Sequence, residues 1–169
     1  MCGRFASVLP ADELARIFAT EGPLPDTQPS WNIAPTQPAV VVRRHPQTAA
    51  RQLSVLNWGL LASFVKDPAS ARRPFNARAE TVATSTLFRG AFARRRCLVP
   101  ADAYYEWRTE PAGKQPFAVA RADGTPLALG GIWEGHRGGG RRNHQKLRYR
   151  NGAGERVAAN AARARAVGC

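Results

Sequence analysis

The chain of 169 residues has few acidic residues, few cysteines and no long apolar run, and each of these shortages bears on the class of protein to which the chain belongs. No window approaches eighteen uncharged apolar residues, so a membrane-spanning helix is excluded. The three cysteines are odd in number and form no CxxC pair, so neither a disulfide framework nor a zinc ribbon is expected. Residues 1–5 lack the basic and apolar stretches of a secretory signal, so we expect a cytoplasmic protein.

Acidic residues are scarce relative to basic ones, since 12 Asp or Glu oppose 25 Lys or Arg and the net charge is +13. This excess is uneven along the chain. Residues 136–169 hold nine Lys or Arg against the single Glu155. Because the tail supplies most of the charge, overall basicity is weak evidence for a nucleic-acid partner.

The length suits one domain. Residues 1–135 have the pattern of a folded domain, because short apolar runs alternate with the turn-forming residues Pro, Gly and Asp. The pattern is rich in strands because these runs contain β-branched and aromatic residues. The expected strands are Arg4–Val8, Val40–Arg43, Leu53–Leu60, Cys97–Val99, Ala103–Trp107, Phe117–Arg121 and Leu127–Trp133.

Two helices are expected beside these strands. The first follows Pro10, which suits a first turn, and presents Leu14, Ile17 and Phe18 on one face. The second runs from Thr86 to Arg95 with its arginines in solvent. Residues 136–169 are rich in Arg, Ala and Gly and poor in large apolar side chains, so we expect this tail to be disordered.

Cys2 is the most informative residue for chemistry, because removal of Met1 would leave a free α-amine and a thiol on one residue. Their ordinary pKa values, about 8 for the amine and about 8.5 for the thiol, leave part of each reactive near neutral pH. With an aldehyde, the amine forms a Schiff base and the thiol closes a thiazolidine ring. Acyl transfer by the thiolate, or a buried structural cysteine, are the alternatives.

Five blocks of sequence follow Met1-Cys2-Gly3-Arg4-Phe5 in a specific order. They are Trp31-Asn32-Ile33-Ala34-Pro35-Thr36, Trp58-Gly59-Leu60, Phe75-Asn76-Ala77-Arg78-Ala79-Glu80-Thr81, Arg96-Cys97-Leu98-Val99-Pro100-Ala101-Asp102 and Tyr104-Tyr105-Glu106-Trp107. Residues 1 to about 134 thereby resemble the SOS-response-associated peptidase (SRAP) family of abasic-site processing proteins. The resemblance implies an α+β, β-rich single domain with antiparallel sheets forming a barrel-like core and a few peripheral helices.

The resemblance also implies a function: recognition of single-stranded DNA in the SOS response and crosslinking of Cys2 to the aldehyde of an abasic site. Lyase and self-peptidase activities are further expectations. Matching motifs place Asn76 and Glu106 beside Cys2, where a carboxylate can move protons and an amide can orient the amine. The alternatives are that Asn76 caps a turn and that Glu106 pairs with a surface arginine.

Arginine suits phosphate oxygens, so Arg4 and Arg78 are the expected DNA contacts, and Arg89 extends them unless it belongs to a solvated helix face. Trp58 and Trp107 can stack on bases, although a tryptophan in a strand is equally often part of the core. No metal, cofactor or membrane is implied, and we expect a monomer that joins the nucleoid when bound to DNA.

The chain departs from the family after about residue 134. Family members continue into further strands and an Ile-His-x-Arg-Met-Pro segment whose histidine assists proton transfer. That segment is absent, and His45, His136 and His144 have no matching neighbours. A truncation or, as we favour, a shift of reading frame near Glu134 explains the departure and predicts an incomplete, marginally stable domain and a poor catalyst.

Two other functions stay open at the level of sequence. Class II glutamine amidotransferases and related N-terminal nucleophile hydrolases also begin Met-Cys-Gly, although the later blocks argue against them. An inactive basic fragment that binds DNA through its tail is the second alternative.

Overall fold

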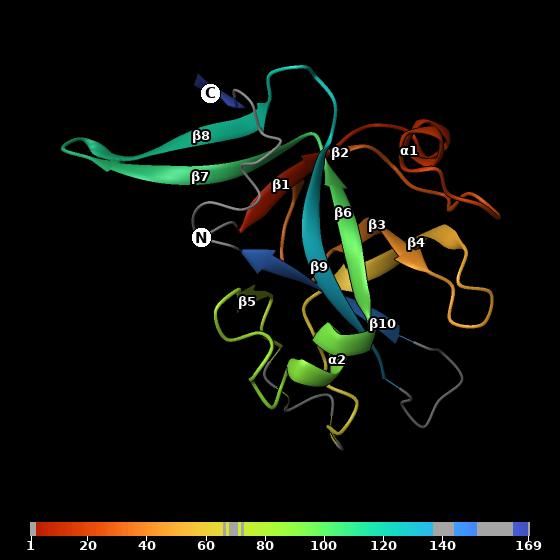
Figure 1. The fold of residues 1–169 in the computed structure, drawn as a ribbon. Coiled ribbons are helices and arrows are strands. Elements are labelled where there is room, and N and C mark those ends of the chain that lie inside the picture. Colours follow the sequence, from red (N-terminus) through yellow and green to blue (C-terminus); the bar gives the residue numbers. More distant parts are fainter. Residues whose placement is uncertain are drawn as a thin grey trace.

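The structure is a computed structural model that describes residues 3–65, 67, 71, 73–136, 144–151 and 164–168. One of its two sheets has five strands in the order β11-β8-β7-β1-β2 (Figure 1). These strands are β1 (Arg4–Ser7), β2 (Ser30–Ile33), β7 (Ala103–Glu110), β8 (Gly113–Arg121) and β11 (Ala164–Gly168).

The second sheet has six strands in the order β4-β3-β6-β9-β10-β5, and an added pairing of β10 with β4 joins five of them into a barrel-like ring. Helices α1 (Ala11–Phe18) and α2 (Arg89–Arg94) lie at the periphery (Figure 1). The expected β-rich α+β class with a barrel-like core is therefore confirmed. The six strands are β3 (Pro38–Arg44), β4 (Arg51–Trp58), β5 (Asn76–Arg78), β6 (Arg96–Ala101), β9 (Leu127–His136) and β10 (His144–Asn151).

Strand β3 is buried on both faces, which explains its uninterrupted apolar run. Val41 belongs to the main core cluster with Phe5, Leu56 and Trp58. Val40 and Val42 face the other way and pack with Leu14 of α1 in a second cluster. A strand covered on both sides needs apolar residues at every position rather than at alternate ones.

Helix α1 follows the sequence pattern closely. Pro10 stands at its N-cap, Asp12 and Glu13 lie in its first turn, and Leu14 is buried. Ile17 differs from expectation, because it is 39% exposed. The helix ends at Phe18, and the next residue, Ala19, adopts a left-handed conformation that directs the chain away.

Helix α2 is shorter than the expected Thr86–Arg95 helix, since it begins at Arg89 and ends at Arg94. Arg96 belongs to β6. Ala91 packs with Val82, Ala77 and Ile132 in a third cluster. The side chain of Arg95 was expected in solvent, but Arg95 Nη2 lies 2.8 Å from Glu134 Oε2, and Glu134 is buried. Burial of the carboxylate requires a cationic partner, and this need draws Arg95 inward.

Two strands lie in the tail for which no strand was expected. Strand β10 pairs with β9, β4 and β5, and β11 pairs with β8. The expected domain boundary at residue 135 stays a prediction. Among the described residues, no helix has the length and apolarity needed to cross a membrane.

Cys97 lies in the main core cluster and is only 6% exposed. Burial raises the pKa of its thiol to about 12, despite the opposing effect of the Arg43 charge. We therefore expect Cys97 to resist iodoacetamide at pH 8 in the native protein and to react after unfolding, because the thiolate is the nucleophile. Peptide mass mapping of the alkylated protein measures this, and rapid native labelling of Cys97 would contradict it.

Candidate active site and DNA interface

Strand β1 carries the N-terminal residues to the edge of β7. Arg4 pairs with Tyr105 and Phe5 with Tyr104, so the same antiparallel register, continued by one residue, sets Gly3 opposite Glu106. Cys2 lies outside the described residues and is bonded directly to Gly3. Glu106, the carboxylate predicted to assist Cys2, thus lies on the strand next to Gly3, the residue that follows Cys2.

Glycine at position 3 leaves room beside that carboxylate. A Cβ built on Gly3 would meet no atom within 4 Å. Side chains alternate along a strand, so Glu106 shares a face of β7 with Tyr104, which packs against the main core. Glu106 is partly buried, and no described atom fills the position that a Cβ on Gly3 would take.

Trp58 ties β1 to the segment that holds Asn76. Its ring packs edge-on against Phe5, with 5.6 Å between centroids, and against Phe75, with 5.9 Å. Its indole Nε1 donates a hydrogen bond of 2.8 Å to the carbonyl of Phe75, directly before Asn76. One buried side chain therefore fixes the start of β5 relative to β1.

The structure corrects the prediction that Trp58 stacks on bases. Trp58 is 1% exposed, so neither face of its ring is available to a ligand. The alternative, a core tryptophan, accounts for its position. Its polar N–H is satisfied inside the core, as a buried indole requires.

Asn76 and Arg78 share one face of β5, because Ala77 between them faces the cluster under α2. Asn76 is partly buried and Arg78 is exposed. Arg89 lies on α2, on the Ala77 side of β5. The structure therefore separates Arg89 from the face that Asn76 and Arg78 share.

The outer face of β1, β2 and β7 combines a cation with exposed aromatic rings. Arg4 Nη1 donates to Asn32 Oδ1 at 3.0 Å, and the Tyr105 hydroxyl donates to the Trp31 carbonyl at 2.9 Å. Trp107 is 43% exposed and Trp31 is 69% exposed. Sequence reasoning did not single out Trp31, although it opens one of the five blocks.

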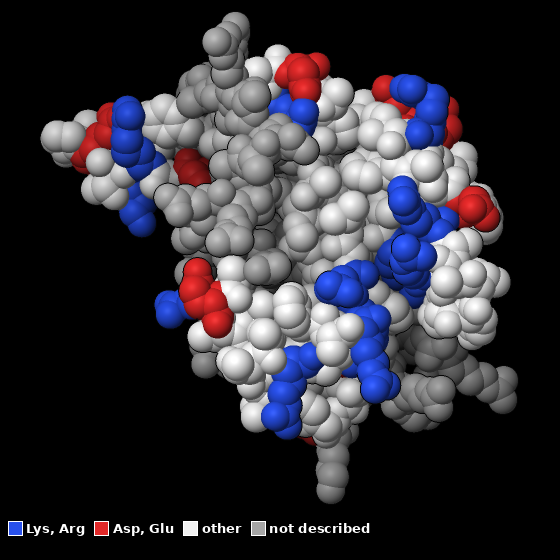
Figure 2. All heavy atoms as spheres, in the orientation of Figure 1, with Lys and Arg blue, Asp and Glu red and all other residues white. Residues whose placement is uncertain are grey.

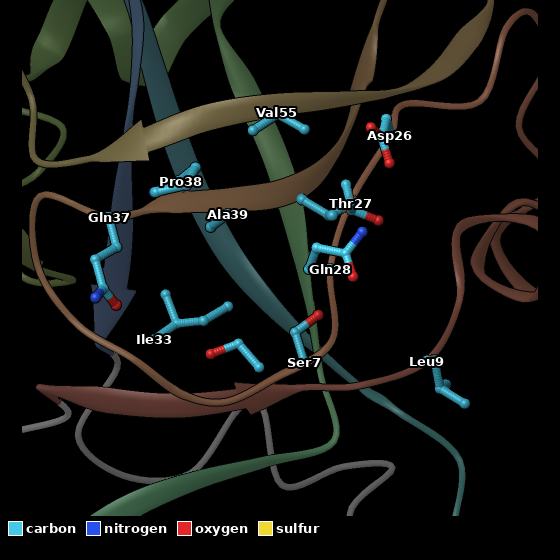
Figure 3. Close-up of a pocket in the computed structure, with 12 residues that line it drawn as sticks. Ser7, Leu9, Asp26, Thr27, Gln28, Ile33, Gln37, Pro38, Ala39 and Val55 are labelled. Carbon is cyan, nitrogen blue, oxygen red and sulfur yellow. The ribbon is translucent and has the colours of Figure 1, made fainter.

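A separate cavity lies elsewhere. It measures about 380 Å³ and is drawn in Figure 3 between β1, β3 and the segment 26–28. Its walls are apolar at Ile33 and Ala39 and polar at Thr27 and Gln28, and Asp26 is its one ionisable residue. It contains none of the predicted site residues. Among the described residues, no group of three or more His, Cys, Asp or Glu is arranged to hold a metal ion.

Comparison with known proteins relates this arrangement to a family. The abasic site processing protein YoqW of Bacillus subtilis (strain 168) is 33% identical over 137 residues, which cover 79% of this chain and 60% of that protein. The abasic site processing protein YedK of Escherichia coli (strain K12) is 31% identical over 137 residues, covering 78% and 59%. This chain thus spans about 60% of the length of these relatives.

Solved structures share the fold. A crystal structure of a protein from Bordetella bronchiseptica aligns with a TM-score of 0.76 at 22% identity, covering 99% of this chain and 82% of that one. Another, from Bacteroides thetaiotaomicron, gives 0.78 at 19% identity, covering 89% and 68%. Residues 1–150 match the family described as SOS response associated peptidase (SRAP). The chain therefore belongs to the SRAP family, as its motifs indicated.

Proposed function

We propose that this chain captures abasic sites in single-stranded DNA covalently, with Cys2 as the nucleophile after removal of Met1. The register of β1 with β7 supports this most directly, because it sets Gly3, the neighbour of Cys2, opposite Glu106 with open space beside it. The names of the relatives, which are abasic site processing proteins, agree with this substrate.

The reaction proceeds in two bond-forming steps. The α-amine of Cys2 attacks the aldehyde carbon of the ring-opened sugar, and loss of water gives an imine. The thiol then adds across the carbon–nitrogen double bond, forming a carbon–sulfur bond and delivering its proton to nitrogen. The product is a thiazolidine ring, which joins protein and DNA without a cofactor.

Glu106 and Asn76 assist these steps. Glu106 accepts a proton from the α-ammonium group before attack and returns one to the departing oxygen. Asn76 holds the amine or the sugar hydroxyl in attack geometry. Arg4 and Arg78 contact phosphates, and Trp107, joined now by Trp31, offers exposed rings to neighbouring bases. Lyase and self-peptidase activities would use the same groups.

Incubation with an oligonucleotide that holds one abasic site tests the proposal. We expect a slowly migrating adduct that survives a denaturing gel, and none with the same oligonucleotide lacking the lesion. Release of ammonia from glutamine without any adduct would instead favour the amidotransferase alternative. Failure of both assays would leave the inactive DNA-binding fragment.

Replacing Glu106 by Gln should slow adduct formation by about 10²–10⁴-fold, because the amide has the same shape but cannot accept a proton. The rate is measured by single-turnover quenching at saturating DNA. Glu110→Gln is the matched control, since Glu110 ends the same strand and pairs with Arg108 at the surface. Equal rates in the two variants would remove Glu106 from the chemistry.

A further inference from the structure

The outer surface of the six-stranded sheet carries a row of arginines away from the face of β5 that holds Asn76 and Arg78. Arg44 of β3 pairs directly with Arg51 of β4. Arg43 pairs with Cys97 of β6, so the same register sets Arg44 opposite Arg96. These three exposed side chains form one cross-strand row, called here the arginine row. Two interstrand spacings of about 4.8 Å make it about 10 Å wide.

No described carboxylate neutralises this row. Arg44 and Arg51 each donate to a backbone carbonyl, at Ala49 and Phe18 respectively, both at 3.1 Å. The ion pairs between described residues involve other arginines. Like charges directly opposite one another on a sheet are destabilising. The arrangement therefore favours an anionic partner that bridges the strands.

A cavity at the row contains a fourth, buried arginine. It measures about 290 Å³ and is lined by Arg43 together with Arg44, Arg51, Arg96 and the apolar Leu98. Arg43 is 8% exposed, donates from Nε to Ser54 Oγ at 3.0 Å, and stacks 4.6 Å from the centre of the Trp133 ring. Its Nη1 is buried and has no hydrogen-bond partner. Burial lowers the pKa of Arg43, whose side chain lies on the core face of β3 with Val41, whereas Arg44 faces outward.

Further basic side chains extend from the arginine row toward the candidate site at β5. Figure 2 shows blue side chains in a band from the β3–β4 region across the lower end of β6 to α2. Helix α2 adds the exposed Arg89 and Arg94, and its Ala91 packs against Ala77, between Asn76 and Arg78. A strand of DNA leaving that site could thus pass from β5 around α2 to the arginine row.

We propose that the arginine row is a second binding surface for the phosphodiester backbone of DNA that flanks the captured lesion. This inference depends on the proposed function only because it takes DNA to be the partner. The row presents guanidinium groups and the aliphatic Leu98, with no exposed ring among its members, so it contacts phosphates and not bases. Binding there is independent of base sequence.

The double variant R44Q/R96Q tests the inference, with R16Q/R121Q as a control that removes the same charge from arginines paired with Glu13 and Asp123. Affinity for a lesion-free single strand is measured over a range of salt concentrations. We expect R44Q/R96Q to lower the slope of log K against log salt by about 1.4, twice the single-strand value for one phosphate, and the control to leave it unchanged. Melting temperatures verify that each variant folds.

The same measurement with duplex DNA identifies the source of the phosphates. A larger change with the single strand assigns the row to the unpaired flank, and a larger change with the duplex assigns it to adjoining paired DNA; both support the proposal. Equal slopes for the two double variants on both DNAs would overturn it. So would loss of binding to anionic phospholipid vesicles in R44Q/R96Q with DNA binding intact, which would assign the row to a lipid surface. Adduct formation by the unaltered protein tests the proposed function separately.

Discussion

Replacing Cys2 by Ala should abolish the denaturation-resistant adduct with abasic DNA while leaving noncovalent binding to single-stranded DNA in place. The reason is that the proposed ring needs an amine and a thiol on the same residue, and only the N-terminal residue can offer both. Cys2→Ser should be nearly as damaging, since a hydroxyl does not close a comparably stable ring. Denaturing gels measure the adduct, and fluorescence anisotropy measures binding.

Cys169→Ala is the control for this experiment, because it removes a thiol with no adjacent α-amine. It should form adduct at the unaltered rate. Adducts of full yield from Cys2→Ala would identify another nucleophile and contradict the mechanism. Loss of both adduct and noncovalent binding would indicate that Cys2 contributes to the DNA interface itself.

The strands that sequence predicted well are those that bury side chains on at least one face. The run Val40–Arg43 and the stretch Cys97–Val99 both lie within observed strands, because burial imposes an apolar pattern on them. Strand β5 was missed: it has three residues, and Ala77 alone of them is buried. Its pairing with β10, a long-range contact, makes it a strand.

The motifs identified the family, but they did not predict which way each side chain faces. Glu106 and Arg4 occur on neighbouring strands but on opposite faces of the sheet, because Arg4 pairs with Tyr105, whereas Asn76 shares a face with Arg78. Burial of Trp58 and exposure of Trp31 could not be read from their blocks, because each is the single aromatic residue of its block and stands next to Asn or Gly. The arginine row depends on the register of three strands, and that register is set by pairing across the sheet.

Substitutions at Trp58 and Trp107 should separate folding from DNA binding. Trp58→Ala should lower the free energy of unfolding by about 3–5 kcal/mol, because it empties a core site beside Phe5 and leaves the Phe75 carbonyl without its donor. This is a large part of the roughly 5–15 kcal/mol that stabilises a typical domain. Denaturant unfolding followed by tryptophan fluorescence and circular dichroism measures the loss.

Trp107→Ala should have the opposite effect, leaving stability nearly unchanged and weakening DNA binding. Its side chain is 43% exposed on β7, so stability should change by no more than about 0.5 kcal/mol. If a base stacks on its ring, affinity for single-stranded DNA should fall by about 1–3 kcal/mol. Trp58→Phe completes the comparison, because it keeps a smaller aromatic ring in the core while removing the N–H. Below its melting temperature it should bind DNA as the unaltered protein does. Weaker binding by folded Trp58→Phe, with no change in Trp107→Ala, would show that DNA is recognised through the Trp58 region after a rearrangement that exposes it.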